Sequence, residues 1–65
     1  MHDNDLRLLS PVQFADYVGV PLATVYQWNY QRTGPPFIKV GRHVRYRRVD
    51  IERWLASRTI TGVNR

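Results

Sequence analysis

Two helix-start signals separated by a single glycine constrain the fold of this chain more than any other feature. Ser10-Pro11 is the first, because a Ser hydroxyl accepts a hydrogen bond from the first turn and Pro at the first helical position needs no N–H. Gly19 suits the left-handed residue that ends a helix, and Pro21 marks the start of the next. We therefore predict helices over about 11–18 and 21–30, joined by a tight turn.

Apolar spacing indicates which side of each predicted helix is buried. In the first helix the apolar residues are Val12, Phe14, Ala15 and Val18, and in the second Val25 and Trp28 lie three apart on one face. Leu6, Leu8 and Leu9 are expected to anchor the preceding segment. Two short helices around a tight turn form a helix-turn-helix pattern, in which the second helix enters the DNA major groove.

A β-hairpin is predicted after the second helix. Thr33-Gly34-Pro35-Pro36 cannot continue a helix, since Gly costs about 1 kcal/mol and Pro about 3 kcal/mol in a helix interior. Strand-like runs at 37–40 and 43–46 flank Gly41-Arg42, where Gly takes the positive φ of a tight turn. Alternation is expected to turn Ile38 or Phe37, then Val40, Val44 and Tyr46, toward the body.

The last predicted helix follows the hairpin. Asp50 and Glu52 are assigned to its first turn and Arg58 to its end, where their charges complement the helix dipole. Ile51, Trp54 and Leu55 form its buried stripe. The predicted fold is mainly α with a small β-hairpin, a winged helix-turn-helix over 8–58, with a flexible arm at 1–7 and a flexible tail at 59–65.

Charge points to an anionic partner. The 65 residues carry ten Lys and Arg against five Asp and Glu, a net charge of +5. The segment from Arg32 to Arg48 holds five Arg and Lys39 but no acid, and a basic segment of this density usually faces phosphate. The alternative reading of this segment is a solvated charged surface.

Several other function classes find no support in the sequence. There is no Cys and only two His, too few for a zinc site, and no glycine spacing of a nucleotide-binding loop occurs. Ser10 and Ser57 have no His nearby in the sequence, and so short a chain scarcely builds a catalytic cleft. No stretch approaches the length of a transmembrane helix. We expect no enzyme, no cofactor and a cytoplasmic location.

The motif residues together resemble the excisionase family of MerR-like winged helix-turn-helix domains. The resemblance covers about residues 8–58 and rests on Leu9-Ser10-Pro11, Ala15, Gly19-Val20-Pro21, Thr24-Val25-Tyr26, Trp28, Pro36, Lys39-Val40-Gly41-Arg42, Arg45-Tyr46, Asp50-Ile51 and Trp54-Leu55. It implies a phage or mobile-element recombination directionality factor, which bends attachment-site DNA and directs an integrase toward excision. It also implies integrase and neighbouring copies on DNA as partners, and a location in a bacterial host cell, on its nucleoid when bound. The chain departs from the common pattern at Gln13, where many relatives carry Glu, and in the polar segment 30–34.

Ten residues are candidate DNA contacts. On the second helix, Gln27 suits bidentate pairing with adenine, Thr24 a phosphate or thymine methyl, and the tyrosine hydroxyls phosphate oxygens. In the hairpin, the resemblance implies that Arg42 lies in or near the minor groove, and the other basic residues suit phosphate. The full set is Thr24, Tyr26, Gln27, Tyr30, Arg32, Lys39, Arg42, His43, Arg45 and Arg47.

Two other functions stay open at this stage. A small MerR-like transcriptional regulator uses the same DNA-binding surface at a promoter. A protein-interaction adaptor instead docks its basic face on an acidic partner and has little affinity for duplex DNA. Because no heptad run is present, we expect a monomer in free solution.

Overall fold

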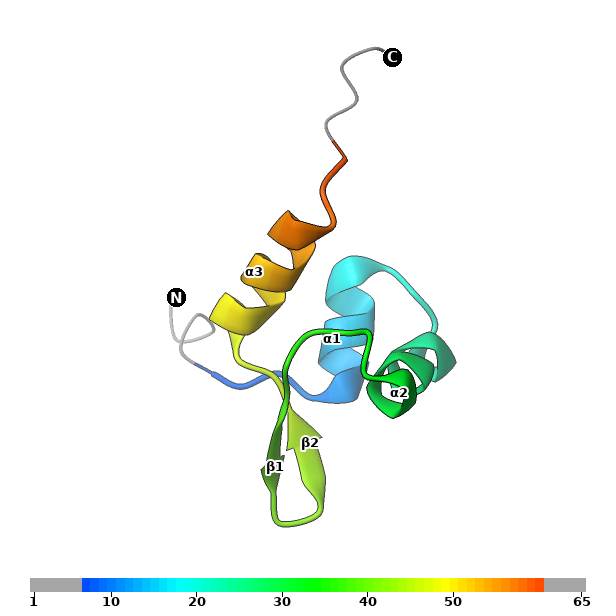
Figure 1. The fold of residues 1–65 in the computed structure, drawn as a ribbon. Coiled ribbons are helices and arrows are strands. Elements are labelled where there is room, and N and C mark those ends of the chain that lie inside the picture. The colour runs from blue at the N-terminus through cyan, green and yellow to red at the C-terminus, as the bar shows by residue number, and fades with distance from the viewer. Residues whose placement is uncertain (1–6, 61–65) are drawn as a thin grey trace.

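The protein consists of three short helices and one two-stranded hairpin (Figure 1). The computed structural model describes residues 7–60. The elements, in chain order, are α1 (Pro11–Val18), α2 (Leu22–Gln31), β1 (Ile38–Val40), β2 (His43–Arg45) and α3 (Arg48–Ser57). The predicted fold class, mainly α with a small hairpin, is confirmed.

Local capping explains why α1 has the predicted bounds. The Ser10 hydroxyl accepts from the Gln13 N–H at 3.1 Å, and the Gln13 side-chain oxygen accepts from the Ser10 N–H at 2.9 Å, a reciprocal capping box. Gln13, at which the chain departs from the common pattern, is therefore one of the two partners in this capping box. At the other end Gly19 has a φ of 77°, and its N–H donates to the Ala15 carbonyl at 2.8 Å.

The second helix is displaced by one residue from the prediction. Pro21 is the residue before the first turn, with an extended backbone, and α2 continues to Gln31. The buried side of the helix agrees with the sequence pattern, because Val25 is fully buried and Trp28 packs against the core.

The hairpin pairs β1 and β2 antiparallel, with Ile38 opposite Arg45, Lys39 opposite Val44 and Val40 opposite His43. Gly41, with a φ of 66°, lies in the turn. Paired residues share a face, and successive residues alternate between faces. Phe37, Val44 and Tyr46 are the hairpin side chains that belong to the core or pack against it.

The expected burial of Val40 is therefore wrong. Val40 shares the face of Ile38 and His43, opposite to that of Val44, and its side chain is 52% exposed. No regular strand turns both Phe37 and Val40 toward the body, because an odd and an even position lie on opposite faces. The same error of face applies to Val12 in α1, which is 59% exposed while Phe14 is fully buried.

A two-residue bridge joins the start of the domain to the end of the hairpin. The Leu9 N–H donates to the Tyr46 carbonyl at 2.8 Å, and the Tyr46 N–H donates to the Leu9 carbonyl at 2.9 Å. Leu9 anchors the preceding segment as predicted, whereas Leu8 is 42% exposed. The predicted arm at 1–7, with Leu6, lies outside the described residues except for Arg7, as does most of the predicted tail at 59–65.

Aromatic rings fill much of the core. Phe14 lies 4.7 Å from Tyr46 and 5.8 Å from Trp54, measured between ring centroids, and Trp28 lies 5.1 Å from Trp54. Tilted and edge-on ring pairs of this kind add to the free energy gained by burial. The ring cluster, with Ile51 fully buried beside it, joins all three helices to the hairpin.

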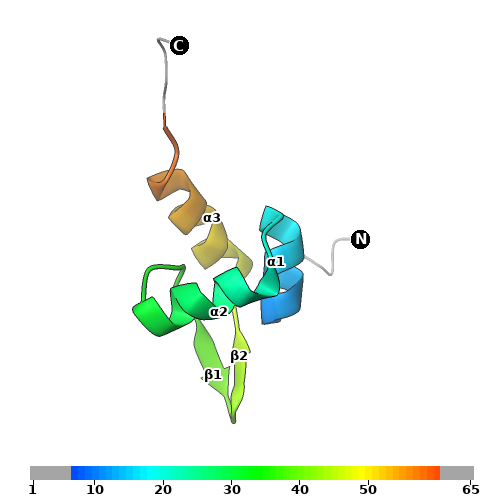
Figure 2. The same cartoon turned by 90° about the vertical axis from the view of Figure 1, so that its right-hand side faces the viewer.

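The hairpin projects away from the helices. In Figure 1 it extends below them, with α1 and α2 to one side and α3 to the other. In the view rotated by 90° about the vertical axis, α2 crosses in front of the base of the hairpin (Figure 2). The second helix and the hairpin are thus adjacent, and the hairpin turn points away from the helices.

One charge assignment in α3, that of Glu52, needs correction, whereas Arg58 is the C-cap of the helix. Asp50 lies in the first turn, but Glu52 lies beyond it and accepts a hydrogen bond from the Tyr17 hydroxyl of α1. Arg58 follows the helix, where its guanidinium lies 4.9 Å from the Trp54 ring centroid and donates to the Thr33 carbonyl at 3.3 Å. Both side chains therefore connect elements distant in the sequence.

Candidate nucleic-acid interface

One face of α2 is exposed along its whole length. Ala23, Tyr26, Gln27 and Tyr30 follow the spacing i, i+3, i+4 and i+7, which places them on a single helical face. Tyr26 is 53% exposed and Tyr30 89% exposed. Thr24 is half-buried at the edge of this face. The face presents hydroxyl and amide groups, which suit base edges and phosphate oxygens.

The opposite face of α2 is held by the core and by one polar contact. The Asn29 amide donates to the Tyr46 hydroxyl at 2.7 Å, and that hydroxyl lies 3.0 Å from the Asn29 side-chain oxygen, to which it donates. Tyr46 is fully buried and follows β2 directly. This contact, which we call the helix–wing joint, fixes α2 relative to the hairpin.

Burial raises the pKa of the Tyr46 hydroxyl above its usual value of 10.0. The hydrogen bond from Asn29 acts in the opposite direction, and the electrostatic influence of Tyr26 raises the pKa further. Sequence reasoning missed Asn29, whose only signal is a polar residue next to the core residue Trp28.

The predicted basic residues in and after the hairpin differ in their exposure and in their side-chain partners. Lys39, Arg42 and His43 are exposed, and Arg42 lies in the turn at the tip. Arg45 is half-buried, and its guanidinium donates to the Val44 carbonyl at 2.7 Å. Arg47 precedes α3 and forms an ion pair with Asp50 at 3.2 Å.

Arg32 adopts an unusual backbone conformation at the end of α2. Its φ is 61°, and within residues 7–60 it is the only residue other than Gly with a positive φ. Its N–H donates to the Asn29 carbonyl at 3.3 Å and the Thr33 N–H donates to the Trp28 carbonyl at 3.0 Å, the two bonds of a Schellman motif. Its guanidinium lies over the ring of Phe37, 5.8 Å from the centroid.

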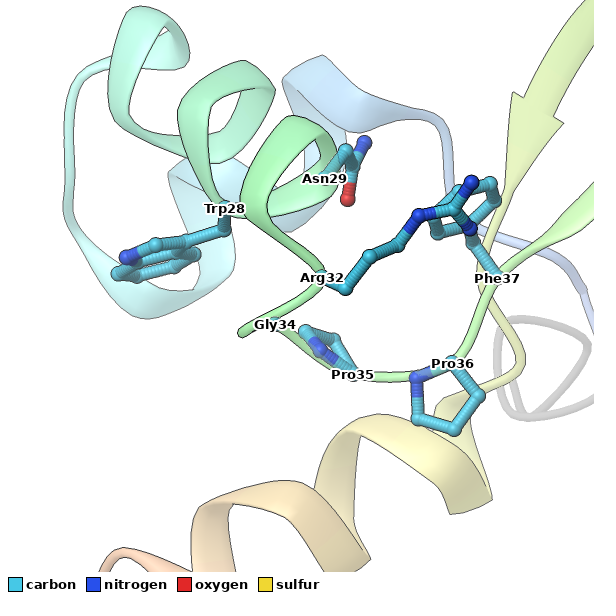
Figure 3. Close-up of a pocket in the computed structure, with 7 residues that line it drawn as sticks. All are labelled: Trp28, Asn29, Arg32, Gly34, Pro35, Pro36 and Phe37. Carbon is cyan, nitrogen blue, oxygen red and sulfur yellow. The ribbon is translucent and has the colours of Figure 1, made fainter.

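A pocket of about 310 Å³ lies where α2 gives way to the hairpin (Figure 3). Its lining residues are Trp28, Asn29, Arg32, Gly34, Pro35, Pro36 and Phe37. Gly34 allows a close approach there, since a Cβ at this position would lie 3.1 Å from the Trp28 Cβ and would require a small shift of that neighbour. The pocket contains one charged group, the Arg32 guanidinium, which extends from the helix end toward Phe37.

The charge distribution makes this side of the molecule cationic. No Asp or Glu occurs between Tyr17 and Val49, a span that holds all of α2 and the hairpin. The acids of the described residues are confined to α1 and α3. A cationic surface with exposed hydroxyl and amide groups suits a polyanion.

Other site types find no support within residues 7–60. No group of three or more His, Cys, Asp or Glu could hold a metal ion there. In the same stretch, no helix is both long and apolar enough to cross a membrane.

Comparison with known proteins supports the assignment of the fold. A family model described as a helix-turn-helix domain matches residues 8–59, most of the chain. No curated protein and no solved structure matched in the corresponding searches. Domains of this kind are DNA-binding modules and typically not enzymes. The chain belongs to the helix-turn-helix domain family.

Proposed function

We propose that the protein binds double-stranded DNA with α2 in the major groove and the hairpin, as a wing, in the adjacent minor groove. The observation that carries this proposal is the hydrogen-bonded contact between Asn29 and Tyr46, the helix–wing joint, which connects the α2 helix to the hairpin. A helix and a wing held in fixed register can engage neighbouring grooves at once. The absence of acids from Tyr17 to Val49 removes repulsion from phosphate along this surface.

In this arrangement Gln27 and Thr24 read base edges, while Tyr26 and Tyr30 donate to phosphate oxygens. Arg42 at the hairpin tip enters the minor groove, where a narrow A·T-rich groove attracts Arg strongly. The remaining predicted contacts are with phosphates: Arg32, Lys39, His43, Arg45 and Arg47. Of these, Arg47 must exchange its partner Asp50 for DNA.

The biological role that we propose is that of an excisionase. The resemblance over residues 8–58 supports a protein that bends attachment-site DNA, acts as several copies and directs a phage integrase toward excision. Simultaneous engagement of two grooves by a strongly basic domain favours bending, because a bent duplex contacts more of the protein.

The test is a gel-shift titration with attachment-site DNA and an unrelated duplex at two salt concentrations. Wild-type protein is expected to form salt-sensitive complexes that prefer the site, with log K falling by about 0.9 per log unit of salt for each phosphate contact. Arg42→Ala is expected to weaken site binding by about tenfold. Arg53→Ala, which removes one exposed charge from α3, is the matched control.

Three outcomes separate the candidate functions. Bending measured by circular-permutation gels, together with stimulation of integrase-dependent excision, supports the excisionase. Site-preferring binding with no effect on recombination, and a site at a promoter, supports a small MerR-like regulator instead. No shift on either duplex at low salt refutes DNA binding and leaves a protein-interaction adaptor.

A further inference from the structure

We propose that Arg32 and Phe37 form a seat for one DNA backbone phosphate between the recognition helix and the wing. The inference rests on the proposed function and adds to it a sequence-independent contact at a defined place. In a duplex, a phosphodiester strand separates each major groove from the neighbouring minor groove. A protein that fills both grooves must therefore straddle that strand at the junction between its helix and its wing.

The pocket of Figure 3 occupies this junction. It lies between the last turn of α2 and the first residues of the hairpin, and Arg32 is its one charged lining residue. Asn29, the other long polar side chain there, is engaged by Tyr46. Arg32 is exposed, and its guanidinium has no carboxylate partner in the part of the chain that the structure describes. A guanidinium presents a planar fork of donors that matches phosphate oxygens.

The backbone of Arg32 adopts a conformation that is unfavourable for a residue with a Cβ. The residue after a helix in a Schellman motif is usually Gly, or sometimes Asn, because a Cβ disfavours positive φ. Here the conformation is adopted by Arg at a φ of 61°, and Gly34 comes two positions later. Strained residues cluster at ligand contacts, where the strain is part of the function.

Phe37 orients the side chain before DNA arrives. The ring lies beneath the Arg32 guanidinium at 5.8 Å and packs against the core through Tyr46, with 6.2 Å between their centroids. A guanidinium resting on a ring keeps its N–H donors free at the edge, so the arrangement restricts the Arg rotamers without consuming its hydrogen bonds. Less conformational entropy is then lost when phosphate binds.

The test uses four variants on the attachment-site duplex and on an unrelated duplex. Arg32→Asn removes the charge but suits positive φ, Arg32→Lys retains the charge, Phe37→Leu removes the ring, and Arg53→Ala is the charge-matched control. Arg32→Asn is expected to weaken binding about five- to tenfold on both duplexes and to reduce the salt slope by about 0.9. Arg32→Lys and Phe37→Leu are expected to fall between Arg32→Asn and wild type.

The melting temperature distinguishes this role from a structural one. Since Asn tolerates positive φ, the Tm of free Arg32→Asn should equal or exceed that of wild type, whereas a structural Arg predicts a lower Tm. If the Arg32→Asn variant binds DNA with the same affinity and the same salt slope as the Arg53→Ala variant, the phosphate seat is overturned and the proposed function is left intact. A loss confined to the attachment site overturns it also, because that result marks a base contact. If wild type binds neither duplex, the proposed function fails and the seat fails with it.

Discussion

Removing the Tyr46 hydroxyl should weaken both the fold and the register between α2 and the wing. Tyr46→Phe keeps the buried ring and its contacts with Phe14 and Phe37, so packing changes little. It removes a hydroxyl that lies 2.7 and 3.0 Å from the two polar atoms of the Asn29 side chain. Asn29 is half-buried, so water only partly replaces the lost partner.

The magnitude follows from these contacts. A net intramolecular hydrogen bond contributes about 1 kcal/mol, and leaving a partly buried amide without its partner adds a penalty of about half that size. We expect Tyr46→Phe to lower the free energy of unfolding by about 1.5 kcal/mol, which corresponds to a fall in Tm of about 6 to 12 °C for a domain of this size. Asn29→Ala should cost about as much.

Urea denaturation followed by far-UV circular dichroism measures this effect, and a double-mutant cycle isolates it. If the two side chains act through each other, the double variant should lose about 1 kcal/mol less free energy of unfolding than the sum of the two single losses. Tyr30→Phe, at a hydroxyl on an 89% exposed side chain, is the control and should leave stability unchanged. Additive losses, or a Tyr46→Phe protein as stable as wild type, would refute the helix–wing joint as an energetic link.

Three further predictions address the cap, the core and pH. Ser10→Ala should lower the free energy of unfolding by about 1 kcal/mol in urea melts, because the capping box of α1 loses an acceptor. Ser10→Asp should retain most of the stabilisation by the cap. Equal losses in both variants would contradict the capping role. Phe14→Ala should cost about 3 to 5 kcal/mol, enough to unfold much of so small a domain at 25 °C, and a native-like circular dichroism spectrum would show that the ring cluster is not the main core. Because burial raises the pKa of Tyr46 and the hydrogen bond to Glu52 raises that of Tyr17, the unfolded chain releases these protons first, near pH 10.0. The free energy of unfolding should therefore keep the full contribution of these groups below that pH and decrease above it, less steeply in Tyr46→Phe. An unchanged slope in that variant would contradict the raised pKa of Tyr46.

The parts of the fold that local chemistry dictates were predictable from the sequence. The bounds of α1 follow from the Ser10 cap and the left-handed Gly19, both of which act within a few residues. The hairpin turn at Gly41 follows from its positive φ in the same way. The exposed face of α2 was also predictable, since Val25 and Trp28 mark the buried side and helical geometry assigns the rest.

The errors share a different origin, since each depends on contacts between residues distant in the sequence. Glu52 reads as a helix-dipole acid in isolation, but its partner Tyr17 lies in another helix. Val40 was assigned to the core from strand alternation, but only the packing of the hairpin on the helices shows that the buried face is the one with Phe37, Val44 and Tyr46. Arg32 was predicted as a DNA contact but its positive φ was not, because Arg carries no local signal for that conformation and only the three-dimensional path of the chain shows it.

The bridge between Leu9 and Tyr46 also affects the order in which this protein can fold during synthesis. The residues of α1 and α2 are complete at Gln31, yet Leu9, which precedes the cap of α1, gains its backbone partner only once Tyr46 has left the ribosome. The same late residue supplies the ring on which Phe14 packs. A ribosome-bound chain that stops before the second strand should therefore lack stable tertiary structure, and the helical pair should become protease-resistant only after the wing emerges.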